Sequence, residues 1–224
     1  MNKSIQIKSE VLRYLGHKDQ EVDTITDKII DESIEEIKQL AKERYVYKFF
    51  EISSDGKDLK LIDGNLKLKG RNIRDHLSRS KSCLLMAVTL GHKVDTKIRY
   101  YEKISMVKAM ILDACATAFI EGVCDELHGK IEGELDAGNR LTSRYSPGYG
   151  DLPIDIQGDF LSALDAERSI GLNATSHSIL IPRKSVTAIA GVIRRGEKTR
   201  EKSCRDCNKY NTCNFSRGGK KCGY

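Results

Sequence analysis

Residues 93–135 constrain the fold more than any other segment of the chain. They contain no proline, and their apolar residues recur at intervals of three and four. The stripe runs through Val107, Ile111, Ala114, Ala118, Val123 and Leu127. These intervals match the turn of an α-helix, so the segment predicts one or two long helices with one face against a core.

The first third of the chain predicts a helix followed by strands. Residues 23–44 have isoleucine and leucine at helical spacing, and Asp23 or Thr24 is suited to cap the helix start. Residues 45–52 are aromatic and β-branched, as is typical of a strand. Leucines alternate across residues 59–68 around Asp63-Gly64, which predicts a tight hairpin.

The rest of the chain alternates between helical and extended patterns. The apolar run at residues 83–90 predicts a buried strand in the centre of the sheet. Residues 138–153 form a loop of conformationally demanding residues, and residues 154–170 predict a short helix that Gly171 terminates. Strands are expected at residues 178–181 and 186–193, joined by residues 182–184.

This order of elements lacks a regular βαβ alternation. It therefore predicts an α+β fold with a largely antiparallel, twisted sheet flanked by helices and followed by a cysteine-rich C-terminal tail. We expect one domain over residues 1–200 and a separate tail over residues 201–224. No internal repeat is apparent.

Composition narrows the class of protein. Hydrophobic residues make up 39% and charged residues 31% of the chain, as in an ordinary folded protein. The start has no apolar segment typical of a signal peptide, and no stretch is long and apolar enough for a membrane span, so we expect a cytoplasmic protein. The net charge of +6 arises from 38 basic and 32 acidic residues mixed along the chain. That mixture disfavours a nucleic-acid partner and leaves an acidic protein partner open.

The loop from Arg144 to Pro153 is the strongest candidate for a binding site. It combines a cation, two tyrosines, two prolines and two glycines. Proline fixes the backbone and glycine lets a ligand approach it closely, so such a loop presents main-chain groups in one arrangement. The Arg144 guanidinium suits a carboxylate, and the ring of Tyr149 offers an apolar face with a polar tip. A zwitterionic ligand with a purine would fit; the alternative is a rigid turn whose arginine pairs with a nearby aspartate.

The loop resembles that of the methionine synthase activation domain. The segment Arg144-Tyr145-Ser146-Pro147-Gly148-Tyr149 matches the family's R-x-x-P-G-Y, and Pro182 followed by Ser185-Val186 is similar to its proline and S-V-S-G. The stretches 107–109 and 116–119 look like the family's long helix, so the resemblance spans about residues 104–192. Residues 150–153 lack the family's cysteine and the histidine after it.

The resemblance implies a reactivation module that binds S-adenosylmethionine (AdoMet) and positions it for reductive methylation of cobalamin on a separate corrinoid protein. Arg144 would hold the ligand carboxylate, the backbone around Ser146, Pro147 and Gly148 would meet the adenine or ribose, and Tyr149 would lie near the sulfonium. Helical spacing makes Asp113 and Glu121 candidates for the ligand's amino group.

The implied partners are a corrinoid-binding methionine synthase or a related methyltransferase, with a flavodoxin- or ferredoxin-type electron donor. The chemistry is positional, so no catalytic nucleophile is expected. The sequence indeed lacks the G-x-S-x-G, H-E-x-x-H, P-loop and G-x-G-x-x-G motifs. The scattered histidines and the apolar contexts of Cys83, Cys115 and Cys124 are more typical of structural residues.

A metal site is predicted in the tail. Its four cysteines follow the spacing C-x2-C-x5-C-x8-C, which is suited to a zinc ion or an iron–sulfur cluster, and the spacing does not choose between them. The ligands would be Cys204, Cys207, Cys213 and Cys222. A flexible tail with free thiols is the plain alternative. The chief rival function is a nucleic-acid-binding module with a zinc knuckle, and a further one is the reactivation of a different corrinoid methyltransferase.

Overall fold

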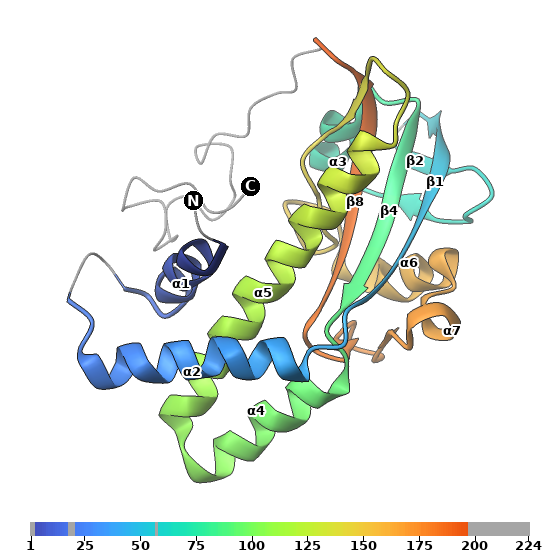
Figure 1. Cartoon of the computed structure of the whole chain (residues 1–224). Coiled ribbons are helices and arrows are strands. Elements are labelled where there is room, and N and C mark those ends of the chain that lie inside the picture. Colours follow the sequence, from blue (N-terminus) through green and yellow to red (C-terminus); the bar gives the residue numbers. More distant parts are fainter. Residues whose placement is uncertain (1–2, 18–20, 57, 197–224) are drawn as a thin grey trace.

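The computed structural model describes residues 3–17, 21–56 and 58–196 of the chain. Its centre is a six-stranded sheet in the order β3-β2-β1-β4-β8-β5. Figure 1 labels β2, β1, β4 and β8 of this sheet. All neighbouring strands of this sheet are antiparallel. The strands are β1 (Arg44–Asp55), β2 (Asp58–Leu61), β3 (Lys67–Leu68), β4 (Ser82–Thr89), β5 (Asn139–Leu141) and β8 (Ser185–Arg194). The expected α+β fold with a largely antiparallel sheet is confirmed.

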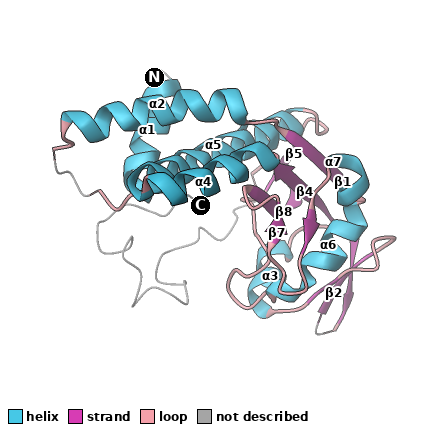
Figure 2. Cartoon of the chain, turned by 90° about the horizontal axis from the view of Figure 1, so that it is seen from below, coloured by secondary structure: helices cyan, strands magenta, loops and turns pink. Residues whose placement is uncertain are grey.

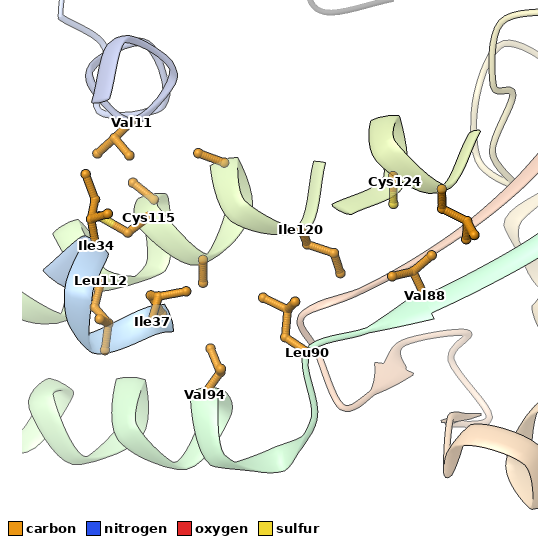
Figure 3. Close-up of a cluster of buried hydrophobic side chains, with 14 of the residues drawn as sticks. Val11, Ile34, Ile37, Val88, Leu90, Val94, Leu112, Cys115, Ile120 and Cys124 are labelled. Atoms are coloured by element: carbon orange, nitrogen blue, oxygen red, sulfur yellow. The ribbon is translucent and has the colours of Figure 1, made fainter. Parts of the chain in front are cut away.

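A helical layer lies on one side of the sheet. The long helix α5 (Met106–Gly133) is accompanied by α1 (Lys3–Tyr14), α2 (Thr24–Leu40) and α4 (His92–Ile104), as Figure 2 shows. Apolar residues from all four helices meet in one cluster with the strands (Figure 3). This cluster explains why α5 is apolar on several sides, because it packs against α1, α2, α4 and the sheet.

Shorter helices cover the opposite face of the sheet. They are α3 (Arg71–Leu77), the 3-10 turn η1 (Ile154–Ile156), α6 (Gln157–Leu164) and α7 (Ala166–Ile170). Phe160, Leu164 and Ile73 are fully buried in a second apolar cluster that they form with the strands. Helices therefore pack against both faces of the central strands β4 and β8.

Strand β4 lies in the middle of the sheet, between β1 and β8, as its sequence predicts. Leu84, Met86 and Val88 belong to the cluster on the α5 side, whereas Cys83 and Leu85 belong to the cluster on the other side. Because both faces are buried, neither set of alternate residues is polar, which accounts for the continuous apolar run.

Several local predictions are also confirmed. Helix α2 begins after Asp23, whose carboxylate accepts hydrogen bonds from the backbone N–H groups of Ile25 and Thr26 at 3.0 and 2.9 Å. The leucine hairpin forms β2 and β3, with Leu59 opposite Leu68, but its connection spans residues 62–66 and is longer than the tight turn expected at Asp63-Gly64. Residues 93–135 form α4 and α5, which meet at Ser105, the residue that caps the start of α5.

Two local predictions are wrong. The helix expected over residues 154–170 is three pieces, because Asp165 has a left-handed backbone (φ 53°) that separates α6 from α7; Gly171 does terminate α7. The strand expected at residues 178–181 is reduced to β7 (Leu180–Ile181). It pairs with β6 (Asn173–Ala174) in a small second sheet, so it does not join the main sheet beside β8.

None of the helices described is long and apolar enough to cross a bilayer.

Candidate functional site

The candidate loop, Arg144 to Pro153, begins as an extension of the sheet. Tyr145 and Ile189 of β8 exchange two backbone hydrogen bonds, each 2.8 Å long. Three residues before Tyr145, the N–H of Thr142 donates to the carbonyl of Gly191 at 2.9 Å. The start of the loop is therefore fixed to a core strand, and the loop leaves the sheet only after Tyr145.

Short-range hydrogen bonds then hold the loop in one conformation. The Tyr149 N–H donates to the Ser146 carbonyl at 3.1 Å, and Gly148 and Leu152 close a second turn through a 3.0 Å bond from the Gly148 N–H. Gly148 and Gly150 have φ values of 89° and 54°, which residues with a Cβ rarely adopt. The glycines are thus required by the backbone of the loop.

Tyr145 is the buried anchor of the loop. Only 4% of the residue is exposed, and its hydroxyl donates to the Tyr149 carbonyl at 3.0 Å. The rings of Tyr145 and Tyr149 meet edge to face, with centroids 6.1 Å apart. Burial raises the pKa of Tyr145 to about 12, so its hydroxyl remains a hydrogen-bond donor at neutral pH.

Asp151 joins the loop to helix α3. Its carboxylate accepts hydrogen bonds from the backbone N–H groups of Arg71 and Asn72 at 2.6 and 3.0 Å, which caps the start of the helix. Gly70 precedes the helix, and a Cβ on that residue would collide with the Asp151 carboxylate. Nothing in the local sequence predicted this contact, because the cap comes from 80 residues away.

Removing this cap should destabilise both the loop and α3. We expect Asp151→Ala to lower the free energy of unfolding by about 1–2 kcal/mol, the usual cost of losing a helix cap. Urea denaturation measures this change. Asp155→Ala is the matched control, since Asp155 is exposed on the adjoining 3-10 turn. Equal effects of the two substitutions would contradict the structural role of Asp151.

The outer side of the loop is open. Gly148, Tyr149 and Gly150 are exposed, whereas Pro147 and Leu152 are buried beneath them. Among the described residues, no hydrogen bond reaches the carbonyls of Pro147 and Gly148. The loop therefore presents a tyrosine ring and two backbone acceptors on a rigid support.

Arg144 lies at the head of the loop and points to helix α5. Its guanidinium forms ion pairs with Glu121 at 2.8 Å and Asp125 at 2.6 Å, and only 15% of its side chain is exposed. Burial opposes the charged form most strongly, but the hydrogen bond with Asp125 and the negative charges of Asp125 and Glu121 together raise the pKa of Arg144. The arrangement includes the arginine–aspartate pairing that the sequence left open as the alternative to ligand binding.

Asp113, the other acidic candidate, has a different cation. Its carboxylate lies 2.9 Å from the ammonium of Lys184, which also donates to the Thr117 hydroxyl at 2.8 Å. Lys184 belongs to the turn after Pro182, and Asp95 fixes that turn by accepting the N–H groups of Arg183 and Lys184. The similarity of the Pro182 segment to the family motif thus corresponds to an ordered turn against α5.

The two acidic candidates, Asp113 and Glu121, lie at different positions along helix α5. Asp113 and Glu121 are eight residues apart and so lie on one side of the helix, about 12 Å from each other along its axis. This distance is too large for one amino group to contact both carboxylates. Asp113 and Thr117 also line a hollow of about 370 Å³ between α1, α4 and α5, which does not include Arg144 or Tyr149.

The histidines and cysteines agree with structural roles. Burial lowers the pKa of His128, and the neighbouring Arg144 lowers it further. Burial raises the thiol pKa values of Cys83, Cys115 and Cys124 to about 12, so these thiols are unreactive at neutral pH. Within the described residues there is no cluster of metal ligands. The four cysteines of the tail, and the boundary at residue 200, lie outside the described residues.

Comparison with known proteins identifies the fold. No family model matches the sequence, and no curated protein matches it. A solved structure of the MetH reactivation domain bound to AdoHcy superimposes with a TM-score of 0.58 at 13% identity. In fold, the chain resembles the MetH reactivation domain. The match covers 80% of this chain and 69% of the MetH reactivation domain.

The similarity to the MetH reactivation domain confirms the fold that the loop motif implied. At 13% identity it concerns the fold alone, so residue roles need their own support. Residues that the sequence did not single out are Asp125, Asp151 and Lys184. Each of them contacts a residue that is distant in the sequence, and no local sequence motif predicts such contacts.

Proposed function

We propose that this chain binds AdoMet at the outer side of the Arg144–Pro153 loop and serves as the reactivation module of a cobalamin-dependent methionine synthase. The main support is the combination of a rigid R-x-x-P-G-Y loop with a fold similar to that of the MetH reactivation domain bound to AdoHcy. Cobalamin on the partner protein would supply the reacting centre. The residues of this chain would only bind and orient the methyl donor.

The charges at the head of the loop suit a zwitterionic ligand. Arg144 would take the ligand carboxylate, and Glu121 beside it would take the amino group. Both are held in place by their own ion pair, with Asp125 as a second support for the guanidinium. The open carbonyls of Pro147 and Gly148 would accept hydrogen bonds from the adenine or ribose, next to Ser146. The ring of Tyr149 would lie against the sulfonium, where a cation and an aromatic face attract each other.

The position of the amino group decides between Glu121 and Asp113. We favour Glu121 because it lies next to Arg144, whereas Asp113 is paired with Lys184 about two helical turns away. The two carboxylates are a matched pair, because they lie on one helix and each contacts one buried cation.

Calorimetry with AdoHcy tests this assignment. Glu121→Gln is expected to weaken AdoHcy binding about tenfold, as loss of a charge-assisted hydrogen bond does, and Asp113→Asn is expected to leave it unchanged. The deaminated analogue of AdoHcy should bind wild type and Glu121→Gln equally. If Asp113→Asn alone weakens AdoHcy binding, the amino group lies at Asp113. If wild type binds neither AdoMet nor AdoHcy, the proposed function fails.

The partner and the tail are parts of the same proposal. The partner would be the corrinoid domain of a methionine synthase or a related methyltransferase, with a flavodoxin- or ferredoxin-type protein as electron donor. Cys204, Cys207, Cys213 and Cys222 would bind zinc or an iron–sulfur cluster. Metal analysis and visible absorption of anaerobically purified protein distinguish the two, and protein without either metal would refute the site.

A further inference from the structure

Strand β1 has an open edge along more than half of its length. It pairs with β4 over residues 44–51, but its other side pairs with β2 only over residues 52–55. Figure 1 shows β2 beside one end of β1 only. In the described part of the chain, no strand lies beside residues 44–50 on that side. These residues span about 23 Å of strand edge.

The direction of the backbone groups on this edge follows from two hydrogen bonds. The Glu51 carbonyl accepts the N–H of Ile62 at 3.0 Å on the β2 side, whereas the Ile52 N–H donates to Lys81 at 2.9 Å on the β4 side. The register to β4 is continuous, and backbone groups alternate in direction along a strand. Tyr45, Tyr47 and Phe49 therefore direct their N–H and carbonyl groups to the open side.

The side chains of the same three residues form a partly exposed aromatic stripe. Tyr45 and Phe49 are each 44% exposed, although they lie on the face of the sheet that carries α5. The Tyr47 ring lies between them, with centroid distances of 6.5 and 6.3 Å. Aromatic residues on an unpaired edge are a common site for adding a strand from another chain.

The opposite face of this edge carries positive charge. Arg44 and Lys48 alternate with the aromatic residues, and neither forms an ion pair within the described residues. Lys48 donates to the carbonyl of Ala163, and the buried Nε of Arg44 has no hydrogen-bond partner. The exposed ammonium of Lys48 could therefore pair with a carboxylate on an added strand, next to the positive charge of Arg44.

We propose that residues 44–50 of β1 bind an extended, acidic segment of a partner protein as an added strand. Its apolar side chains contact the stripe of Tyr45, Tyr47 and Phe49, and its alternate acidic side chains lie opposite Arg44 and Lys48. A second copy of this chain fits less well. If two copies paired through residues 44–50 in antiparallel fashion, the β2 hairpin of each copy would meet the end of α2 in the other copy. This proposal does not depend on AdoMet binding.

Fluorescence anisotropy with synthetic peptides tests the charge pattern, using the full chain. A peptide in which valine and glutamate alternate is expected to bind. Its counterpart with lysine in place of glutamate should bind about tenfold more weakly, since like charges then lie opposite each other. Lys48→Glu should shift the preference toward the lysine peptide. Absence of binding by the glutamate peptide, or equal binding of both peptides, overturns the proposal.

Substitutions at Tyr47 test whether the backbone takes part. Tyr47→Ala and Tyr47→Pro both remove the ring, but only proline removes the outward N–H, and the bonds to β4 remain. Tyr47→Pro is expected to bind the glutamate peptide about tenfold more weakly than Tyr47→Ala. Equal affinities contradict strand addition. Thermal unfolding checks that both variants fold, and sedimentation equilibrium detects self-pairing: a wild-type dimer that Tyr47→Pro dissociates would replace the acidic partner with a second copy.

AdoHcy calorimetry on Tyr47→Pro separates this inference from the proposed function. Unchanged AdoHcy affinity with lost peptide binding is the expected result. Failure of AdoHcy binding in wild type would refute the proposed function and leave the peptide experiment unaffected.

Discussion

Arg144→Met is expected to weaken AdoMet binding by at least about a hundredfold, because a bidentate hydrogen bond between two charged groups is lost. Arg144→Lys keeps the charge but not the planar fork, so we expect an intermediate loss of about tenfold. Isothermal titration calorimetry measures both values. Met is chosen because its length preserves packing of the stem beside α5.

Arg144 also holds the loop to Glu121 and Asp125, so its replacement could weaken binding by changing the shape of the loop. Decarboxylated AdoMet separates the two roles, because it lacks only the group that Arg144 would bind. Decarboxylated AdoMet should bind the wild-type protein weakly, and Arg144→Met should lower its affinity only a little further. An equal loss for both ligands would show that the arginine acts only through the shape of the loop. Arg99→Met, on the exposed side of α4, controls for the change of charge.

Leu85→Ala is expected to lower the free energy of unfolding by about 2–5 kcal/mol. Leu85 is fully buried in the central strand, within the cluster that α3, α6 and α7 cover. The interior is close-packed and relaxes only partly around such a cavity, so the lost contacts are not fully recovered. Chemical denaturation followed by circular dichroism measures the change.

Leu180→Ala provides the comparison for Leu85. Leu180 is half-buried and belongs to the small two-stranded sheet, so we expect it to cost less than half as much. If the two substitutions destabilise the protein equally, burial in the central strand β4 does not account for the cost of Leu85→Ala.

The elements with a long, regular pattern were predictable from the sequence. Helix α5 and strand β4 have apolar patterns that extend over many residues, and local propensity and burial agree there. Helix α3 has no such signal, because it is seven residues long and its cap is Asp151, far away in the chain. The break at Asp165 was equally hidden, since an aspartate tolerates a left-handed backbone without any neighbouring glycine or proline.

The candidate site, like the fold, could be predicted from the sequence only in part. The rigidity of residues 144–153 could be predicted from glycine and proline, whose backbone preferences are local properties. The pairing of Arg144 with α5, and of Lys184 with Asp113, could not, because it depends on how the sheet places two distant segments against one helix. A sequence shows which residues are able to bind a charge, and tertiary packing decides which charge they meet.

Helix α5 carries the partners of both segments. Glu121 and Asp125 hold Arg144, and Asp113 holds Lys184 on the same continuous run of backbone hydrogen bonds. A helix of this kind moves as one body, so a shift that changes one of these contacts also changes the other. Because both ion pairs are anchored on one helix, a displacement of α5 as a whole would move the supports of the loop and of the turn after Pro182 together, whereas the loss of a single carboxylate leaves the helix in place.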